Sequence, residues 1–315
     1  MPPLVSIVVP TYVANARQEA LLDETLCTVE SQTCDDYEVV VVDDGSPISV
    51  ERIAGAHART VSVRQPNGGS AAARNTGIAR SAGEYLVFLD ADDHLLPPAL
   101  EAGLHAFATH PEAGFVVGPR EEMTYEGGPV DWQVPPPPPQ TDLYVPLLGF
   151  DWYIIPPSSA MFRRALADQI GGFRDPWGAD DLDFYLRAAR AASAWCYQEP
   201  AVTRYRRYST SSSRDGARML QSIRAVYERQ RPLVTGHADA EAAFRRGLER
   251  LTGIFLDCAV ENVQDRLRSG DYENARRCVQ ILAEESPERL RRIDASALAR
   301  LLDRGEHLRD EVHER

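Results

Sequence analysis

Apolar and polar positions follow two alternating patterns over about the first 118 residues. Short runs rich in β-branched residues predict buried strands, because such side chains pack closely in a sheet that is covered on both faces. The expected strands are residues 4–9, 38–46, 60–64, 84–90 and 114–117. Apolar residues at helical spacing lie between them, and the expected helices are one through residues 22–29, then 71–82 and 97–109. This rhythm predicts an α/β fold with a mostly parallel sheet and right-handed crossovers.

The pattern becomes helical at about residue 213 and stays so. Two apolar stripes at helical spacing indicate amphipathic helices with outer faces rich in Arg and Glu. The stripes are Phe244, Leu248, Leu251, Phe255 and Cys258, and Ala275, Cys278, Val279 and Leu282. Two interpretations stay open: the helices pack against the α/β part of the chain, or they form a hairpin that makes a homo-oligomer or docks a partner.

Composition narrows the function classes. The formal net charge of −13 argues against a nucleic-acid partner, because such a partner needs an excess of basic residues. All 34 basic residues are arginine, which excludes Schiff-base lysine chemistry and a P-loop lysine. Five cysteines without CxxC spacing are typical of a cytoplasmic protein without a disulfide framework or zinc site. No run reaches the ~18 apolar residues of a membrane span, but the Arg-rich helices leave peripheral attachment at the inner membrane face open.

Two acidic clusters follow two of the expected strands. Asp43 and Asp44 end the second strand, and Asp90, Asp92 and Asp93 follow the fourth. Ligands of open α/β sheets bind at the carboxyl ends of the strands. Carboxylates placed together repel one another and attract a hard cation such as Mg²⁺ or Mn²⁺. Either cluster alone also fits a solvated turn, but two at strand ends of one parallel sheet favour a metal-assisted site.

Two further segments suit ligand binding. Residues 67–69, Asn-Gly-Gly, open a helix that carries Arg74, and the glycines let the backbone approach an anion at the helix N-terminus. A simple turn with a helix cap is the alternative. Asp180 and Asp181 lie at the start of a later helix, where acidic residues also occur merely as complements of the helix dipole.

Five blocks, taken in order, resemble the motifs of the family 2 inverting glycosyltransferases of GT-A fold. They are VSIVVPTY (5–12), VVVDDGS (40–46), NGGSAAARNTGIARSAGEYLVFLDADD (67–93), GGF (171–173) and ADDLDFYLR (179–187). The resemblance covers residues 4–210 and none of the last hundred. It implies a GT-A catalytic domain over residues 1–212, with a donor half over about 1–118 and an acceptor half over about 119–212. A helical C-terminal region over 213–315 follows.

The resemblance also implies a site for a nucleotide-sugar donor. The implied donor-binding residues are Pro10, Thr11, Tyr12, Asp43, Asp44, Asn67, Gly69, Arg74, Asp90 and Ala91. Residues 10–12 and Asp44 would hold the base and ribose, and Arg74 would lie on the diphosphate side. Asp92 is implied as the direct ligand of Mn²⁺ or Mg²⁺, with Asp90 facing the ribose or the metal. The cation would neutralise the charge that builds on the departing diphosphate.

Asp181 is implied as the general base and Asp180 as its acidic neighbour. The base would take the proton of an acceptor hydroxyl while that oxygen attacks the anomeric carbon, which inverts its configuration. The chain departs from the family pattern at three positions. Val13 stands where Asn is common, Asp180 where Glu is usual and Tyr208 where a His is frequent, so base contacts and the metal site are expected to differ here.

The resemblance favours UDP as the nucleotide, ahead of dTDP and GDP. The acceptor is a growing polysaccharide, a lipid-linked sugar or a small metabolite. The main alternative is a non-catalytic nucleotide-sugar-binding or scaffold protein on a degenerate GT-A fold. A nucleotidyltransferase usually has a Gly-rich N-terminal loop with a basic residue, which residues 10–12 do not supply.

A run of five prolines, residues 135–139, must be extended because each ring fixes φ and removes a hydrogen-bond donor. It is either a stiff connector or a rim of the acceptor cleft. Four aromatic residues near the run suit the second interpretation, and they are Trp132, Tyr144, Trp152 and Tyr153.

Overall fold

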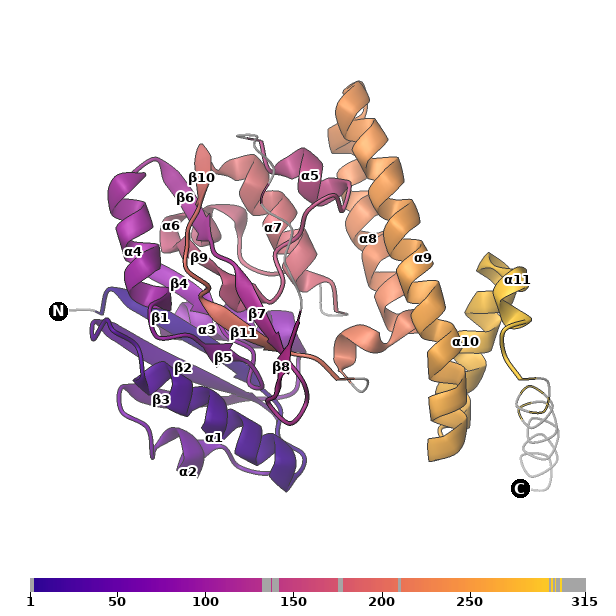
Figure 1. Cartoon of the computed structure of the whole chain (residues 1–315), viewed down its shortest axis with the longest axis horizontal. Coiled ribbons are helices and arrows are strands. Elements are labelled where there is room, and N and C mark those ends of the chain that lie inside the picture. The colour runs from indigo at the N-terminus through magenta and orange to yellow at the C-terminus, as the bar shows by residue number, and fades with distance from the viewer. Residues whose placement is uncertain are drawn as a thin grey trace.

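The computed structural model describes residues 3–131, 137, 142–174, 178–208, 211–294, 296, 298 and 301. A seven-stranded sheet forms the centre of the fold, in the order β10-β6-β9-β4-β1-β2-β3 (Figure 1). Its strands are β1 (Val5–Thr11), β2 (Tyr37–Asp44), β3 (Thr60–Gln65), β4 (Tyr85–Phe88), β6 (Ala113–Val117), β9 (Ala160–Arg163) and β10 (Ala194–Tyr197). All neighbours pair in parallel except at β9, which confirms the mostly parallel sheet.

Strand β9 was not expected from the sequence. It has only four residues, so it offers little alternation to detect, yet it lies between β4 and β6 and is antiparallel to both. Its first residue, Ala160, pairs with Val117 at the carboxyl end of β6. The segment that leads into β9 therefore arrives at the edge of the sheet where the parallel strands end.

A smaller sheet lies beside the first and was also missed by the sequence pattern. Its order is β5-β11-β7-β8, and β11 runs parallel to β7 but antiparallel to β5. Its strands are β5 (His94–Leu95), β7 (Arg120–Met123), β8 (Pro129–Val130) and β11 (Thr203–Arg206). Because β5 follows the acidic cluster at Asp90 directly, this sheet fixes where that loop lies.

Helices cover both faces of the main sheet (Figure 1). Those preceding residue 213 are α1 (Ala16–Glu30), α2 (Glu51–Ala54), α3 (Ser70–Arg80), α4 (Ala99–Thr109), α5 (Tyr144–Leu148), α6 (Arg164–Ile170) and α7 (Asp180–Ala191). In β1, Ile7 and Val9 join a core with α1 and α4, whereas Val8 joins a second core with α3 and α7. This two-sided burial explains why β1 consists almost entirely of apolar residues.

The C-terminal region is helical, as expected. Its helices are α8 (Gly216–Val234), α9 (Ala238–Ser269), α10 (Tyr272–Glu285) and α11 (Pro287–Leu290). Helices α8 and α9 lie side by side next to the α/β part, and α10 and α11 lie farther from the sheet (Figure 1). Phe244, Leu251 and Phe255 of α9 are buried in the same hydrophobic core as Phe88 of β4, so these helices do pack against the α/β part.

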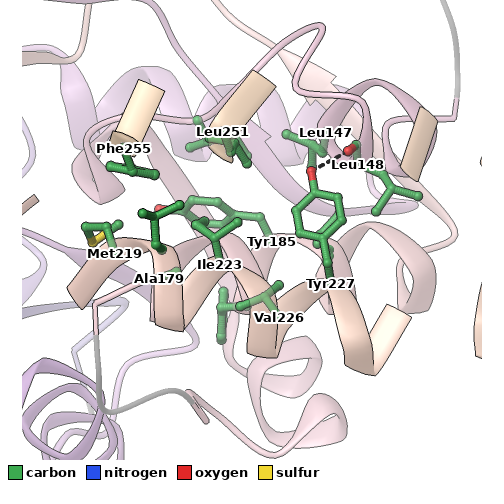
Figure 2. Close-up of a cluster of buried hydrophobic side chains, with 14 of the residues drawn as sticks. Leu147, Leu148, Ala179, Tyr185, Met219, Ile223, Val226, Tyr227, Leu251 and Phe255 are labelled. Atoms are coloured by element: carbon green, nitrogen blue, oxygen red, sulfur yellow. Dashed lines mark hydrogen bonds between the residues drawn. The ribbon is translucent and has the colours of Figure 1, made fainter. Parts of the chain in front are cut away.

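Close backbone contacts fix α8 and α9 in place. A Cβ atom on Gly247 of α9 would lie 1.9 Å from the carbonyl oxygen of Leu148, and one on Gly216 would lie 2.3 Å from that of Phe255. The Tyr227 hydroxyl donates a hydrogen bond of 2.6 Å to the Leu148 carbonyl (Figure 2). Within the described residues, no helix combines the length and the apolar character that a membrane span needs.

Candidate active site

A cavity of about 470 Å³ opens at the carboxyl ends of the parallel strands. One wall is polar and comes from the loops that follow β1, β2 and β4 together with the first turns of α3 and α7. The expected site residues in this wall are Pro10, Thr11, Tyr12, Asp44, Arg74, Asp90, Ala91, Asp92, Asp180 and Asp181. The fold thus brings together residues that are up to 171 positions apart in the sequence.

Asp44 organises the loop between β3 and α3. Its Oδ1 accepts hydrogen bonds from the Gly68 amide at 2.8 Å and from Gln65 Nε2 at 2.7 Å, and its Oδ2 accepts one from the Gly69 amide at 2.8 Å. Gly69 has φ of 83°, a left-handed conformation that glycine adopts without strain. Asp44 therefore holds the start of α3 beside the cavity, and Asp44 itself also lines the cavity.

Three of the expected donor-binding residues do not belong to the described lining of the cavity. Asp43 is buried, accepts a hydrogen bond from the Ser46 amide at 2.8 Å and pairs with Arg64 at 2.6 Å, which stabilises the turn after β2. Asn67 is exposed, and Gly69 acts through its amide on Asp44. Nearby, the Val13 amide donates to Ser46 Oγ at 2.8 Å, so the backbone of Val13 joins the two loops.

Arg74 connects the two acidic groups of the site. This side chain is buried, and its guanidinium pairs with Asp90 at 2.7 Å on one side and with Asp180 on the other. Asp180 also accepts a hydrogen bond from Ser70 Oγ at 3.1 Å. The Arg74 Nε is buried without a hydrogen-bond partner among the described residues. Asp180 thus positions Arg74, while one donor of Arg74 remains unsatisfied.

Asp181 differs from Asp180 in its surroundings. Its carboxylate accepts a hydrogen bond from the Leu182 amide at 2.7 Å and lines the cavity. Burial, and after it the negative charge of Asp180, raises the pKa of Asp181 to about 7, although Arg74 acts in the opposite direction. A carboxyl group with a pKa near neutrality is a competent proton acceptor at neutral pH.

The acidic cluster after β4 splits into two parts. Asp90 and Asp92 line the cavity, whereas Asp93 is buried outside its described lining and accepts a hydrogen bond from the Arg206 amide at 2.8 Å. Burial and the charge of Asp90 raise the pKa of Asp92. The carboxylates of Asp90 and Asp92 fit a divalent cation, because its charge would relieve the repulsion between them and their oxygens would be its ligands.

Tyr208 and Arg206 complete the surroundings of this loop. The Tyr208 hydroxyl donates a hydrogen bond of 2.6 Å to Asp92 Oδ2. Tyr208 therefore contacts the acidic loop from the position where the family often has His. Arg206 is fully buried, and its guanidinium donates to the Asp92 carbonyl at 2.8 Å and pairs with Glu24 at 2.9 Å. No sequence signal marked Arg206, because its partners lie far from it in the chain.

The opposite wall of the cavity is mainly apolar. Figure 2 shows much of it, with side chains from α5, α7, α8 and α9 facing one another. Its residues include Leu147, Phe150, Tyr153, Ile154, Ile155, Leu182, Tyr185, Met219, Ile223, Leu251 and Phe255. The stripe with Leu251 and Phe255 was expected to pack against the α/β part or to form a hairpin for a partner, and neither expectation marked it as a cavity wall.

The expected aromatic rim is only partly described. Tyr153 lines the cavity, but Tyr144 and Trp152 are buried in the core. Trp132 and residues 135, 136, 138 and 139 of the proline run lie outside the described residues. Among the described residues, the one group of three side chains with ligand atoms close enough to share a metal is Asp23, Cys27 and His57, away from this cavity.

Comparison with known proteins gives a consistent result. The sequence model of the family described as Glycosyl transferase family 2 matches residues 6–171. An uncharacterised glycosyltransferase of Bacillus subtilis, EpsJ, is 38% identical over 99 residues, which are 30% of this chain. The chain spans only 28% of the length of that relative.

Two solved structures share the fold over most of the chain. TarS 1–349 of S. aureus in complex with UDP-GlcNAc has a TM-score of 0.62 at 16% identity, covering 89% of this chain and 92% of that one. The mannosyltransferase PcManGT of Pyrobaculum calidifontis, in complex with GDP-Man and Mn²⁺, has a TM-score of 0.56 at 22% identity, covering 96% and 86%. These structures show the expected GT-A fold. Since the family model matches more than half of the residues, the chain belongs to glycosyl transferase family 2.

Proposed function

We propose that the chain is a glycosyltransferase that moves a sugar from a nucleoside-diphosphate donor to an acceptor hydroxyl with inversion. The observation that carries this proposal is the position of Asp181 in the same cavity as most of the expected donor-binding residues. Burial and the charge of Asp180 also raise the pKa of this carboxyl group to about 7. Family membership supports the reaction class. UDP is the favoured nucleotide, ahead of dTDP and GDP.

In this proposal the two walls of the cavity have separate tasks. Thr11, Tyr12 and Asp44 bind the base and ribose, and the sugar lies in the same cavity beside Asp181, which also belongs to the polar wall. The Asp181 carboxylate accepts the proton of the acceptor hydroxyl. That oxygen then bonds to the anomeric carbon from the face opposite the diphosphate, and the bond from this carbon to the diphosphate oxygen breaks, which inverts the configuration.

Asp92 and Asp90 are the residues that would hold Mn²⁺ or Mg²⁺. When bound, the cation supplies Lewis-acid stabilisation of the negative charge on the leaving diphosphate. The relatedness in fold to a protein whose structure contains Mn²⁺ supports this choice. Arg74 keeps a positive charge beside Asp90, and its unsatisfied Nε suits an oxygen of the diphosphate.

We also propose how the chain is divided and where it works. Residues 1–118 form the donor half, residues 119–212 the acceptor half, and the helices after residue 212 complete the acceptor wall. The five cysteines are free, which suits the cytoplasm or the inner membrane face. Polysaccharide biosynthesis is a fitting context for a member of this family.

The test is a calorimetric titration of the protein with UDP, dTDP and GDP, each with Mn²⁺ and with EDTA. We expect metal-dependent binding of one nucleotide and at least a tenfold loss of that binding in Asp92→Ala. Binding without any turnover of the matching nucleotide sugars would favour the alternative, a non-catalytic nucleotide-sugar-binding protein. The absence of binding to all three nucleotides would refute the donor site itself.

A further inference from the structure

The acceptor side of the cavity is built mainly from carbon atoms. Directly after Asp181, Leu182 and Tyr185 of α7 line the cavity, and Met219 and Ile223 of α8 continue its wall. Phe255 of α9 lies across from α8, and Figure 2 shows the Tyr185 ring among side chains from both helices. A sugar placed against this wall would lose water from its hydroxyl groups without gaining matching partners.

The wall is held in its shape by the surrounding backbone. Helix α9 approaches α5 at Gly247 and α8 approaches α9 at Gly216, where any larger residue would overlap backbone atoms. The hydrogen bond from Tyr227 to the Leu148 carbonyl fixes the same junction. The apolar wall therefore stands on a close-packed core and is preformed for a ligand.

One polar atom of this wall is buried and lacks a partner. The Tyr185 side chain is only 3% exposed, and its hydroxyl has no hydrogen-bond partner among the described residues. Such a group is costly unless a ligand satisfies it. Tyr185 lies one helical turn after Asp181, so the two side chains are neighbours on α7. This arrangement suits an acceptor whose single polar end contacts both residues while its apolar part contacts the apolar wall.

We propose that the acceptor is amphipathic, with an alkyl or aryl group close to the hydroxyl that receives the sugar. This inference rests on the proposed function. The hydroxyl loses its proton to Asp181, and its oxygen bonds to the anomeric carbon as the nucleoside diphosphate leaves with the electron pair. The apolar group lies against Met219, Ile223 and Phe255, and Tyr185 donates a hydrogen bond to the polar end.

The first experiment measures the affinity of n-alkyl β-glucosides for the protein saturated with its nucleotide and Mn²⁺. Methyl, butyl, hexyl and octyl glucoside are compared below their micelle concentrations. Each methylene that reaches the wall is expected to tighten binding by up to about fourfold. We expect octyl glucoside to bind at least tenfold more tightly than butyl glucoside. Equal affinity along the series, or no binding of any member, beside normal nucleotide binding overturns the proposal.

Variants separate the wall from the overall fold. Ile223→Thr and Phe255→Ser are expected to weaken octyl glucoside binding at least fivefold while the nucleotide affinity stays unchanged. Ile254→Ser is the matched control, because Ile254 lies beside Phe255 on α9 but is 44% exposed. Ile223→Thr changes the shape of the side chain less than Phe255→Ser does, so it remains the test of the apolar wall if Phe255→Ser does not fold. Unchanged octyl glucoside binding in folded Ile223→Thr overturns the proposal.

A second arm identifies the source of the apolar group. Octyl glucoside free in solution is compared with dodecyl glucoside embedded in phosphatidylcholine vesicles, and release of the nucleoside diphosphate from the donor is measured. Stimulation by the free glucoside indicates a soluble acceptor, and stimulation by the vesicles alone indicates a membrane lipid. Stimulation by neither overturns the proposal. A loss of nucleotide binding itself would instead refute the proposed function.

Discussion

Replacement of Asp181 by asparagine is expected to stabilise the protein above neutral pH while it removes turnover. Burial and the charge of Asp180 raise the pKa of Asp181 from its ordinary 3.8 to about 7. The folded state therefore holds this proton more tightly than the unfolded state. As pH rises from about 4 to 7, only the unfolded state releases the proton, so the stability of the wild type falls.

The magnitude follows from the pKa difference. One pKa unit corresponds to about 1.4 kcal/mol, so ionised Asp181 destabilises the fold by roughly 4 kcal/mol above pH 7. At pH 5 most of this destabilisation is absent. Asparagine keeps the shape and an oxygen for the Leu182 amide but never ionises. The stability gain of the variant should therefore grow by about 2–3 kcal/mol between pH 5 and pH 8.

The assay is urea unfolding of wild type and Asp181→Asn at several pH values in EDTA without nucleotide. A gain that is independent of pH, or a loss of stability, would refute the raised pKa. Asp183→Asn is a control of opposite sign, because Asp183 is buried and paired with Arg187 at 2.7 Å and with Arg229 at 3.1 Å. Its replacement by asparagine removes the charge that both arginines share and is expected to destabilise the fold.

The raised pKa of Asp181 predicts that turnover of the wild type rises with pH through about 7, because Asp181 must be ionised to accept a proton. A flat pH profile of turnover from pH 5.5 to 8.5 would mean that another residue is the base. Tyr208→Phe removes the hydrogen bond to Asp92 and should lower the Mn²⁺ concentration needed for nucleotide binding by about tenfold, as measured by calorimetry; a higher requirement would contradict this. Gly247→Ala should destabilise the fold by about 1–3 kcal/mol in thermal unfolding, because its Cβ would overlap the Leu148 carbonyl. Gly253→Ala on the same helix, whose Cβ would have space, should instead stabilise it by about 0.5–1 kcal/mol.

The sequence was most informative where chemistry follows directly after a strand. Asp44 and Asp90 were assigned to the site because the carboxyl ends of parallel strands lie at the same edge of a sheet, and both line the cavity. Asp43 shows the limit of this reasoning. Adjacent residues of a strand point to opposite sides, and the sequence does not say which of two neighbouring acids faces the cavity.

Long-range contacts account for most of what the sequence did not predict. Tyr208 was noted as a departure from the family pattern, but its hydrogen bond to Asp92 joins residues 116 positions apart. Phe255 belongs to a stripe that predicts packing, and nothing in a periodic pattern tells a buried contact from a cavity wall. Strand β9 was missed because four residues carry too little alternation to stand out from a loop.

The direction of β9 has a consequence for how this protein tolerates change in length. Between β6 and β9 the chain leaves the main sheet, and this excursion contains β7 and β8 of the smaller sheet and α5, which packs against α9. The entropy of closing a loop grows slowly with its length, so an insertion in a connection between these elements, rather than within one of them, costs little stability. The loops after β1, β2 and β4, which bind the donor in the proposed function, are short and fixed between strands and helices. If the proposed division holds, new acceptors can be accommodated by lengthening such connections while the loops at the carboxyl ends of β1, β2 and β4 stay in place.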